Sequence, residues 1–121
     1  MKMPISEILD RYTITLLKSE RTSENVSDEL SSYEAEINKY NNKEVDVFIE
    51  RLHSVNGKIW DTEKDIRKGK KLTLKEVGEL ALKVRDLNCE RNGIKADIVD
   101  KFSEGFKEIK INYTKVDYGK N

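Results

Sequence analysis

The stretch LTLKEVGELALKVRDLNCERNGIKADIVDKFS, residues 72–103, decides the fold of this chain. Its apolar residues recur at spacings of three and four, which places them on one face of a long helix that packs against another helix. A helix of about 30 residues is about 45 Å long, so the stretch predicts a helical hairpin or bundle. The apolar stripe consists of Val77, Leu80, Ala81, Val84, Leu87, Ile94, Ile98 and Phe102.

Three polar residues, Asn88, Arg91 and Lys95, interrupt that stripe. Because buried polar groups need hydrogen-bonding partners, we expect these side chains to meet polar groups of a neighbouring helix. The start of the long helix is marked by Thr73 and Glu76, which fit a capping box in which each side chain binds a backbone amide of the other.

The same periodicity predicts three earlier helices, and the four helices together cover residues of about 5–20, 27–41, 44–68 and 74–103. The first helix has apolar residues on two faces. We therefore expect contacts from two directions, either centrally in a bundle or at a subunit interface. In the third helix, Asn56 and Glu63 project into the middle of the apolar face.

The turn around Gly69 is too short to carry the chain across a long helix, so it makes the last two helices antiparallel neighbours. The predicted fold class is all-α, a helical bundle with coiled-coil packing and a long antiparallel helical hairpin, and residues 1–121 are expected to form a single domain. Folding about this turn brings Asn56 to the level of residues 84–88. We therefore expect Asn56 and Asn88 to meet.

The pattern changes after Gly105, where Ile109, Ile111 and Tyr113 alternate with polar residues. Strict alternation is typical of a strand. The sequence therefore predicts a short strand-like C-terminal tail, extended over about residues 106–118. An isolated strand is not stable in water, so the tail is expected to lie along the helices or to pair with the same segment of another subunit.

Composition excludes several classes of function. The 23 basic and 23 acidic residues cancel, and no apolar run approaches the roughly 20 residues of a membrane span, so we expect neither nucleic acid nor a membrane as partner. The single Cys89 and the single His53 are too few for a zinc site, and neither a metal nor a cofactor is predicted. Glu7 and Asp10 interrupt the apolar stretch near the N-terminus, which predicts a cytoplasmic protein without a signal sequence.

Three parts of the chain resemble a small family of bacterial and phage proteins, a domain of unknown function. They are ISEILDRYTI at residues 5–14, VNGKIWDTEKDIR at residues 55–67, and the group Asn88, Arg91, Lys95 and Ile98. The resemblance spans most of the chain and implies a compact helical protein, but it supplies no activity. The family pattern has a serine and a glycine at the positions of Pro4 and Ser6, and an acidic residue at the position of Cys89.

The main candidate site is a polar cluster in the seam between the helices. One interpretation is structural, because buried polar residues in a helical seam fix register and partner number. The other is a small cavity in which Asn88, Arg91 and Lys95 bind an anion or polar metabolite, with Trp60 as a stacking wall. The cluster consists of Asp10, Asn56, Trp60, Glu63, Asn88, Arg91 and Lys95.

Two weaker candidates complete the set. Acidic residues at helical spacing could hold magnesium in a metal-dependent nucleotide hydrolase, although the paired acidic motifs of such enzymes are missing. They are Glu76 with Glu79, Glu7 with Asp10, and the set Asp61, Glu63 and Asp65. The basic turn formed by Arg67, Lys68, Lys70, Lys71 and Lys75 could touch phosphate, but it also suits a solvated connection between helices.

The predicted function is a non-enzymatic protein-interaction or assembly protein that acts as a homo-oligomer, with a further protein partner possible. The alternative is a protein that binds an anion or phosphate, or hydrolyses nucleotides, with the polar residues of the seam.

Overall fold

The computed structural model describes residues 3–40, 42–68 and 71–102. This part of the chain is all-α and contains no strand, as predicted. The predicted tail at residues 106–118 lies outside the described residues. The helices are α1 (Ile5–Arg21), α2 (Ser27–Ile37), α3 (Glu44–Arg67) and α4 (Leu74–Phe102).

Only α2 differs from its predicted range by more than a residue or two, because it ends at Ile37 instead of residue 41. After Ile37 the chain tightens into a turn, in which the amides of Lys39 and Tyr40 donate to carbonyls three residues back. Ile37 is the last buried residue of α2, and the Tyr40 ring packs edge-on against Phe102 of α4 with 5.6 Å between ring centroids. The apolar period continues through Tyr40, but that ring packs from outside the helix.

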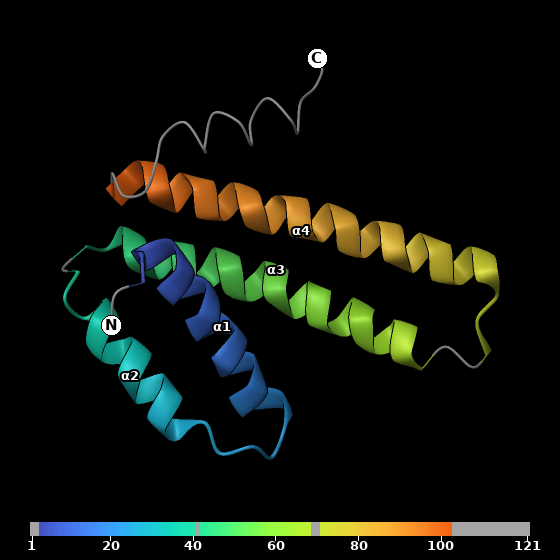
Figure 1. Ribbon diagram of the computed structural model, residues 1–121, viewed down its shortest axis with the longest axis horizontal. Helices are drawn as coiled ribbons and strands as arrows, with labels where there is room; N and C mark the ends of the chain where they lie inside the picture. Colours follow the sequence, from blue (N-terminus) through green and yellow to red (C-terminus); the bar gives the residue numbers. More distant parts are fainter. Residues whose placement is uncertain (1–2, 41, 69–70, 103–121) are drawn as a thin grey trace.

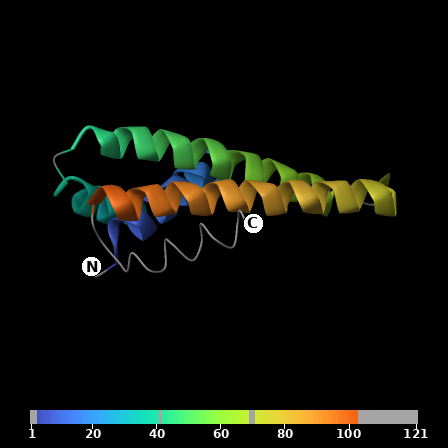
Figure 2. The same ribbon diagram turned by 90° about the horizontal axis from the view of Figure 1, so that it is seen from above.

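Helices α3 and α4 lie side by side and run in opposite directions (Figures 1 and 2). Helix α1 crosses one half of this pair and contacts α2, α3 and α4. The two apolar faces of α1 are thus covered within the chain, by α2 and by the α3–α4 pair. Of the two arrangements left open by the sequence, the described part of the chain takes the central position in a bundle.

The hydrophobic core lies where α1 crosses the α3–α4 pair. Leu9 of α1, Leu52 and Val55 of α3, and Ile98 of α4 are fully buried there. A Phe48–Phe102 contact, with 6.4 Å between ring centroids, extends the core toward the end of α4. Among the described residues, no helix combines the length and the hydropathy that crossing a bilayer requires.

The other half of the α3–α4 pair extends beyond α1 and α2 (Figure 1). We call this half the arm and define it as residues 60–68 and 71–86. The apolar stripe of α4 was expected to be buried along its length, and this expectation is wrong in the arm: Val77, Leu80 and Val84 are only partly buried, and Ala81 is exposed. The reason is that a stripe on a helix is buried only where a neighbouring helix covers it, and α1 reaches the arm only with its last residue, Arg21, which contacts Asp61 of α3.

Candidate functional site

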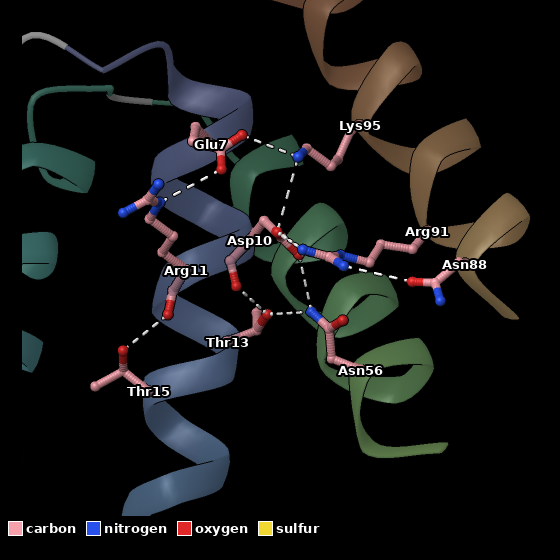
Figure 3. Close-up of polar contacts among 9 residues, drawn as sticks. All are labelled: Glu7, Asp10, Arg11, Thr13, Thr15, Asn56, Asn88, Arg91 and Lys95. Carbon is pink, nitrogen blue, oxygen red and sulfur yellow. Dashed lines mark hydrogen bonds and ion pairs between the residues drawn. The ribbon is translucent and has the colours of Figure 1, made fainter. Parts of the chain in front are cut away.

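Polar side chains from three helices meet where α1 crosses the α3–α4 pair (Figure 3). Asp10 of α1 is at the centre, and its side chain is 1% exposed. Arg91 of α4 binds both carboxylate oxygens, with Nε donating to Oδ1 at 3.0 Å and Nη2 donating to Oδ2 at 2.5 Å. This two-point contact is the geometry in which an arginine–carboxylate pair is strongest. We call the whole group the seam network; it comprises Glu7, Asp10, Thr13, Asn56, Asn88, Arg91 and Lys95.

Asn56 of α3 joins the seam network from the opposite side. Its amide nitrogen donates to Asp10 Oδ1 at 3.0 Å and to Thr13 Oγ1 at 2.9 Å. The Thr13 hydroxyl in turn donates to the backbone carbonyl of Asp10 at 2.8 Å. Asn56 is 5% exposed. These bonds give the buried carboxylate of Asp10 a partner from each helix that α1 crosses.

A second ion pair closes the network toward solvent. Lys95 Nζ donates to Glu7 Oε2 at 2.9 Å and lies 3.8 Å from Asp10 Oδ2. Glu7 precedes Asp10 by three residues, so the two carboxylates project from the same side of α1. Arg91 Nη1 also donates to Asn88 Oδ1 at 3.4 Å. The charged groups between the helices are therefore two carboxylates of α1, Glu7 and Asp10, and two cations of α4, Arg91 and Lys95. Glu7 also accepts a hydrogen bond from the exposed Arg11 of α1, whose Nε lies 3.3 Å from Oε1.

These contacts shift the pKa values of the charged groups. Burial raises the pKa of Asp10, but hydrogen bonds from Arg91 and Asn56, together with the charges of Arg91 and Lys95, outweigh burial and leave it below its ordinary value. The hydrogen bond from Lys95 lowers the pKa of Glu7. The hydrogen bond to Asp10 raises the pKa of Arg91. All three groups are thus held in their charged forms at neutral pH.

The arrangement leaves little unused bonding capacity for a ligand. Every buried side-chain nitrogen or oxygen in the described part of the chain has a hydrogen-bonding partner. Because the two cations are matched by two carboxylates, an anion that enters here would have to displace Asp10 or Glu7. What the network can do as it stands is hold α1 in one position and register on the α3–α4 pair.

The structure brings together five of the seven predicted site residues and separates two. Asp10, Asn56, Asn88, Arg91 and Lys95 belong to the seam network. The two asparagines do not hydrogen-bond to each other among the described contacts, although they were expected to meet; Asn56 donates to Asp10, and Asn88 accepts from Arg91. The buried carboxylate of Asp10 lies between the helices and accepts hydrogen bonds from both Asn56 and Arg91.

Glu63 and Trp60 lie outside the hydrogen-bonded network, although the charge of Glu63 contributes to raising the pKa of Arg91. Glu63 is exposed, and its predicted place in the middle of a buried face is wrong. It lies on the face of α3 that α1 covers at Asn56, but α1 no longer covers that face two turns later. Trp60 is partly buried and lines a separate hollow. Thr13 was missed, and Glu7 was paired with Asp10 only as a possible metal ligand, although each lies three residues from Asp10 and helical spacing alone places them on its side.

The hollow that contains Trp60 lies between the C-terminal ends of α1 and α3. It has a volume of about 620 Å³ and is open to solvent. We call it the Trp60 hollow; it is lined by Arg21, Thr22, Trp60, Asp61, Lys64, Arg67 and Lys68.

The candidate magnesium ligands have other roles. Glu76 forms the predicted capping box: Thr73 N donates to Glu76 Oε1 at 2.9 Å, and Glu76 N donates to Thr73 Oγ1 at 3.1 Å. Hydrogen bonds from the backbone amide and the side chain of Thr73 to the Glu76 carboxylate lower the pKa of Glu76. Glu79 and Asp65 line a shallow hollow with Glu76, yet within the described residues no three His, Cys, Asp or Glu side chains are grouped so that they could hold a metal ion.

Comparison with known proteins gives no match: no family model, no curated protein and no solved structure matches this chain. The resemblance of its motifs to a bacterial and phage family therefore stays a prediction. The function has to be inferred from the residues themselves.

Proposed function

We propose that this protein is a non-enzymatic assembly protein that associates with a second copy of itself through the arm. One observation carries the proposal. A single row of α4 residues, spaced alternately by three and four, runs from the arm into the seam network, and α1 covers only its polar half. The row consists of Leu74, Val77, Ala81, Val84, Asn88, Arg91 and Lys95.

The polar half of the row is covered by α1, whereas two of the four residues in the apolar half are exposed. Asn88, Arg91 and Lys95 face α1 and take part in the seam network. Leu74 is 93% exposed, and Ala81 is also exposed. Alternating three-and-four spacing is the pattern with which one helix packs into another along a coiled-coil seam. The apolar half of the row therefore has the spacing of a packed seam, but α1 does not cover it, and only Val77 and Val84 are partly buried.

A second copy of the chain fits this apolar half because the half is symmetric. Leu74 and Val84 lie five residues to either side of position 79, and Val77 and Ala81 lie two residues to either side. If a two-fold axis passes at the level of residue 79, Leu74 of one copy meets Val84 of the other, and Val77 meets Ala81. A two-fold interface needs such self-complementary positions.

The charge of the arm also permits self-association. The described residues of the arm hold both signs in nearly equal number, so two arms do not repel each other strongly. The basic residues are Lys64, Arg67, Lys68, Lys71, Lys75, Lys83 and Arg85, and the acidic residues are Asp61, Glu63, Asp65, Glu76, Glu79 and Asp86. Two arms packed antiparallel form a four-helix arrangement that continues the bundle.

Sedimentation equilibrium of the full chain tests the proposal. The wild-type chain is expected to form a dimer at micromolar concentration, whereas the double variant Leu74→Glu, Ala81→Glu is expected to be a monomer, because both side chains are exposed and the change adds charge to the interface without disturbing the core. The matched control is Leu82→Glu, which changes a 52% exposed leucine on another side of α4 and should leave the dimer intact.

The proposal is overturned by a wild-type monomer at high micromolar concentration, by a double variant with the same mass as wild type, or by a control that dissociates the dimer equally. Deletion of residues 103–121 separates the tail from the arm. A dimer that persists after the deletion supports the arm as the interface, and a monomer assigns the interface to the tail and contradicts the proposal.

A further inference from the structure

The Trp60 hollow differs from the seam network in the balance of its charges. Its lining contains four cations, Arg21, Lys64, Arg67 and Lys68, and one carboxylate, Asp61. This local excess of three positive charges stands in a chain whose charges cancel. Like charges that are gathered on one surface repel one another, and an anion relieves the repulsion.

The single carboxylate is already engaged. Arg21 Nη1 donates to Asp61 Oδ1 at 2.5 Å and also lies 3.4 Å from the carbonyl oxygen of Gly57. A Cβ atom at Gly57 would lie 3.3 Å from Arg21 Nη2, so the glycine leaves room for the guanidinium against α3. Arg21 is thereby held at one wall of the hollow by two contacts with α3.

The other three cations have no such partner. Within the described part of the chain, Lys64, Arg67 and Lys68 form no ion pair, whereas Arg91 and Lys95 of the seam network each contact a carboxylate. Basic side chains near the C-terminal end of α3 do interact favourably with its dipole. The dipole accounts for the sign of their charge. Lys64 and Arg67 line the Trp60 hollow alone, whereas Lys68 also lines the hollow of Glu76 and Glu79, so the three head groups lie at or beside the Trp60 hollow.

Trp60 supplies a second kind of contact at the same place. It precedes Lys64 by four residues and Arg67 by seven, so the indole and the two cations lie on one side of α3. Proteins hold unpaired nucleotides with both kinds of contact: the base stacks on an aromatic ring, and cations bind the phosphate backbone of the nucleic acid. The hollow, of about 620 Å³, is as shallow and open to solvent as the one lined by Glu76 and Glu79.

We infer that the Trp60 hollow binds a nucleotide unit, with the base against Trp60 and the phosphate against Lys64, Arg67 and Lys68. The unit is either a free nucleotide or one position of a single-stranded nucleic acid, because both present the same base and phosphate. The hollow thus takes over the anion-binding role that the sequence suggested for Asn88, Arg91 and Lys95, whose charges are matched internally.

Trp60 is the only tryptophan in the sequence, so its fluorescence reports directly on the hollow. The full chain is titrated with three probes at low salt: ATP, a ten-nucleotide oligothymidylate, and inorganic tripolyphosphate, which carries charge but no base. Saturable quenching by ATP or by the oligonucleotide is expected, with little quenching by tripolyphosphate. If both nucleotide probes quench equally at equal nucleotide concentration, the free nucleotide is sufficient; if only the oligonucleotide quenches, the ligand is a strand.

Two matched triple variants test the assignment of the cations. Lys64→Gln, Arg67→Gln, Lys68→Gln removes three charges from the hollow and should weaken binding about tenfold or more, since removing a cation that binds phosphate lowers both the affinity and its salt dependence. Lys71→Gln, Lys75→Gln, Lys83→Gln removes the same charge from the arm outside the hollow and should change affinity by less than about twofold. All six side chains are exposed, so both variants are expected to fold.

The inference is overturned if neither nucleotide probe quenches Trp60, if tripolyphosphate quenches as strongly as the nucleotides, or if the two triple variants lose affinity equally. The Trp60 hollow shares no residue with the apolar half of the α4 row. The double variant Leu74→Glu, Ala81→Glu should therefore bind the probes as wild type does, and self-association and nucleotide binding can fail separately.

Discussion

The half of the molecule where α1 crosses the α3–α4 pair and the half formed by the arm use the same helix in opposite ways. In the first half, charged residues of α4 are covered, because α1 brings Asp10 and Glu7 to meet them (Figure 3). In the arm, apolar residues of the same α4 row are left partly or fully exposed (Figure 1). The comparison shows that a third helix determines burial here, and that polarity alone does not.

The two halves also use their cations differently. Arg91 and Lys95 are neutralised within the chain, and they hold α1 in place. Lys64, Arg67 and Lys68 are not neutralised by any described carboxylate, and they lie beside Trp60. The seam network of the first half therefore fixes α1 on the α3–α4 pair, and we call it the joint. The arm together with the Trp60 hollow has the properties of a binding surface.

The largest expected effect is at the joint. Arg91→Ala removes the two-point partner of a buried carboxylate and should lower the free energy of unfolding by about 3–5 kcal/mol. Urea denaturation measures this loss. The matched control in the arm is Arg85→Ala, whose ion pair with Asp86 is largely exposed and whose removal should change stability by less than about 0.5 kcal/mol. Equal midpoints for the two variants would show that Asp10 does not depend on Arg91.

A comparison of two leucines should give the next largest effect. Leu52 is fully buried under α1 and α4, and Leu52→Ala should cost about 2–5 kcal/mol through reduced burial and the cavity that remains. Leu74 is exposed in the arm, so Leu74→Ala should stay within about 0.5 kcal/mol of wild type when the chain is monomeric. A large loss at Leu74 in dilute solution would mean that the arm is covered within a single chain.

Acid should weaken the joint by a smaller amount. The pKa values of Asp10 and Glu7 are lower in the folded chain than their ordinary values of 3.8 and 4.5. Their stabilising contribution is therefore fully present above those ordinary values and is lost as the pH falls through the lower folded values. Urea titrations between pH 7 and pH 3 should show stability falling in acid. Asp10→Asn should be less stable at pH 7 and should lose less on acidification; an unchanged acid dependence would contradict the assignment.

The smallest effect is expected at the outer edge of the joint. The ion pair of Lys95 with Glu7 is about a quarter to a third exposed, so solvent screens it. Lys95→Met should cost no more than about 1 kcal/mol. The same variant should leave the quenching of Trp60 by nucleotides unchanged, because Lys95 does not line the Trp60 hollow. A loss of nucleotide binding in this variant would show that the anion binds at the seam network.

The sequence by itself determined the all-α class, the positions of the helices and the capping box of α4. The physical reason is that helical periodicity and capping depend on residues within a few positions of one another. The sequence also singled out Asp10, Asn56, Asn88, Arg91 and Lys95, because polar residues in an apolar stripe need partners.

Only the tertiary structure decided which of these polar groups bind one another. The angle at which α1 crosses the α3–α4 pair brings Asp10 between Asn56 and Arg91, and the point where α1 ends leaves Glu63 exposed. The same end of α1 leaves the apolar half of the α4 row uncovered and brings Arg21 to the Trp60 hollow. Crossing angle and overlap arise from packing between helices distant in sequence, and no local pattern encodes them.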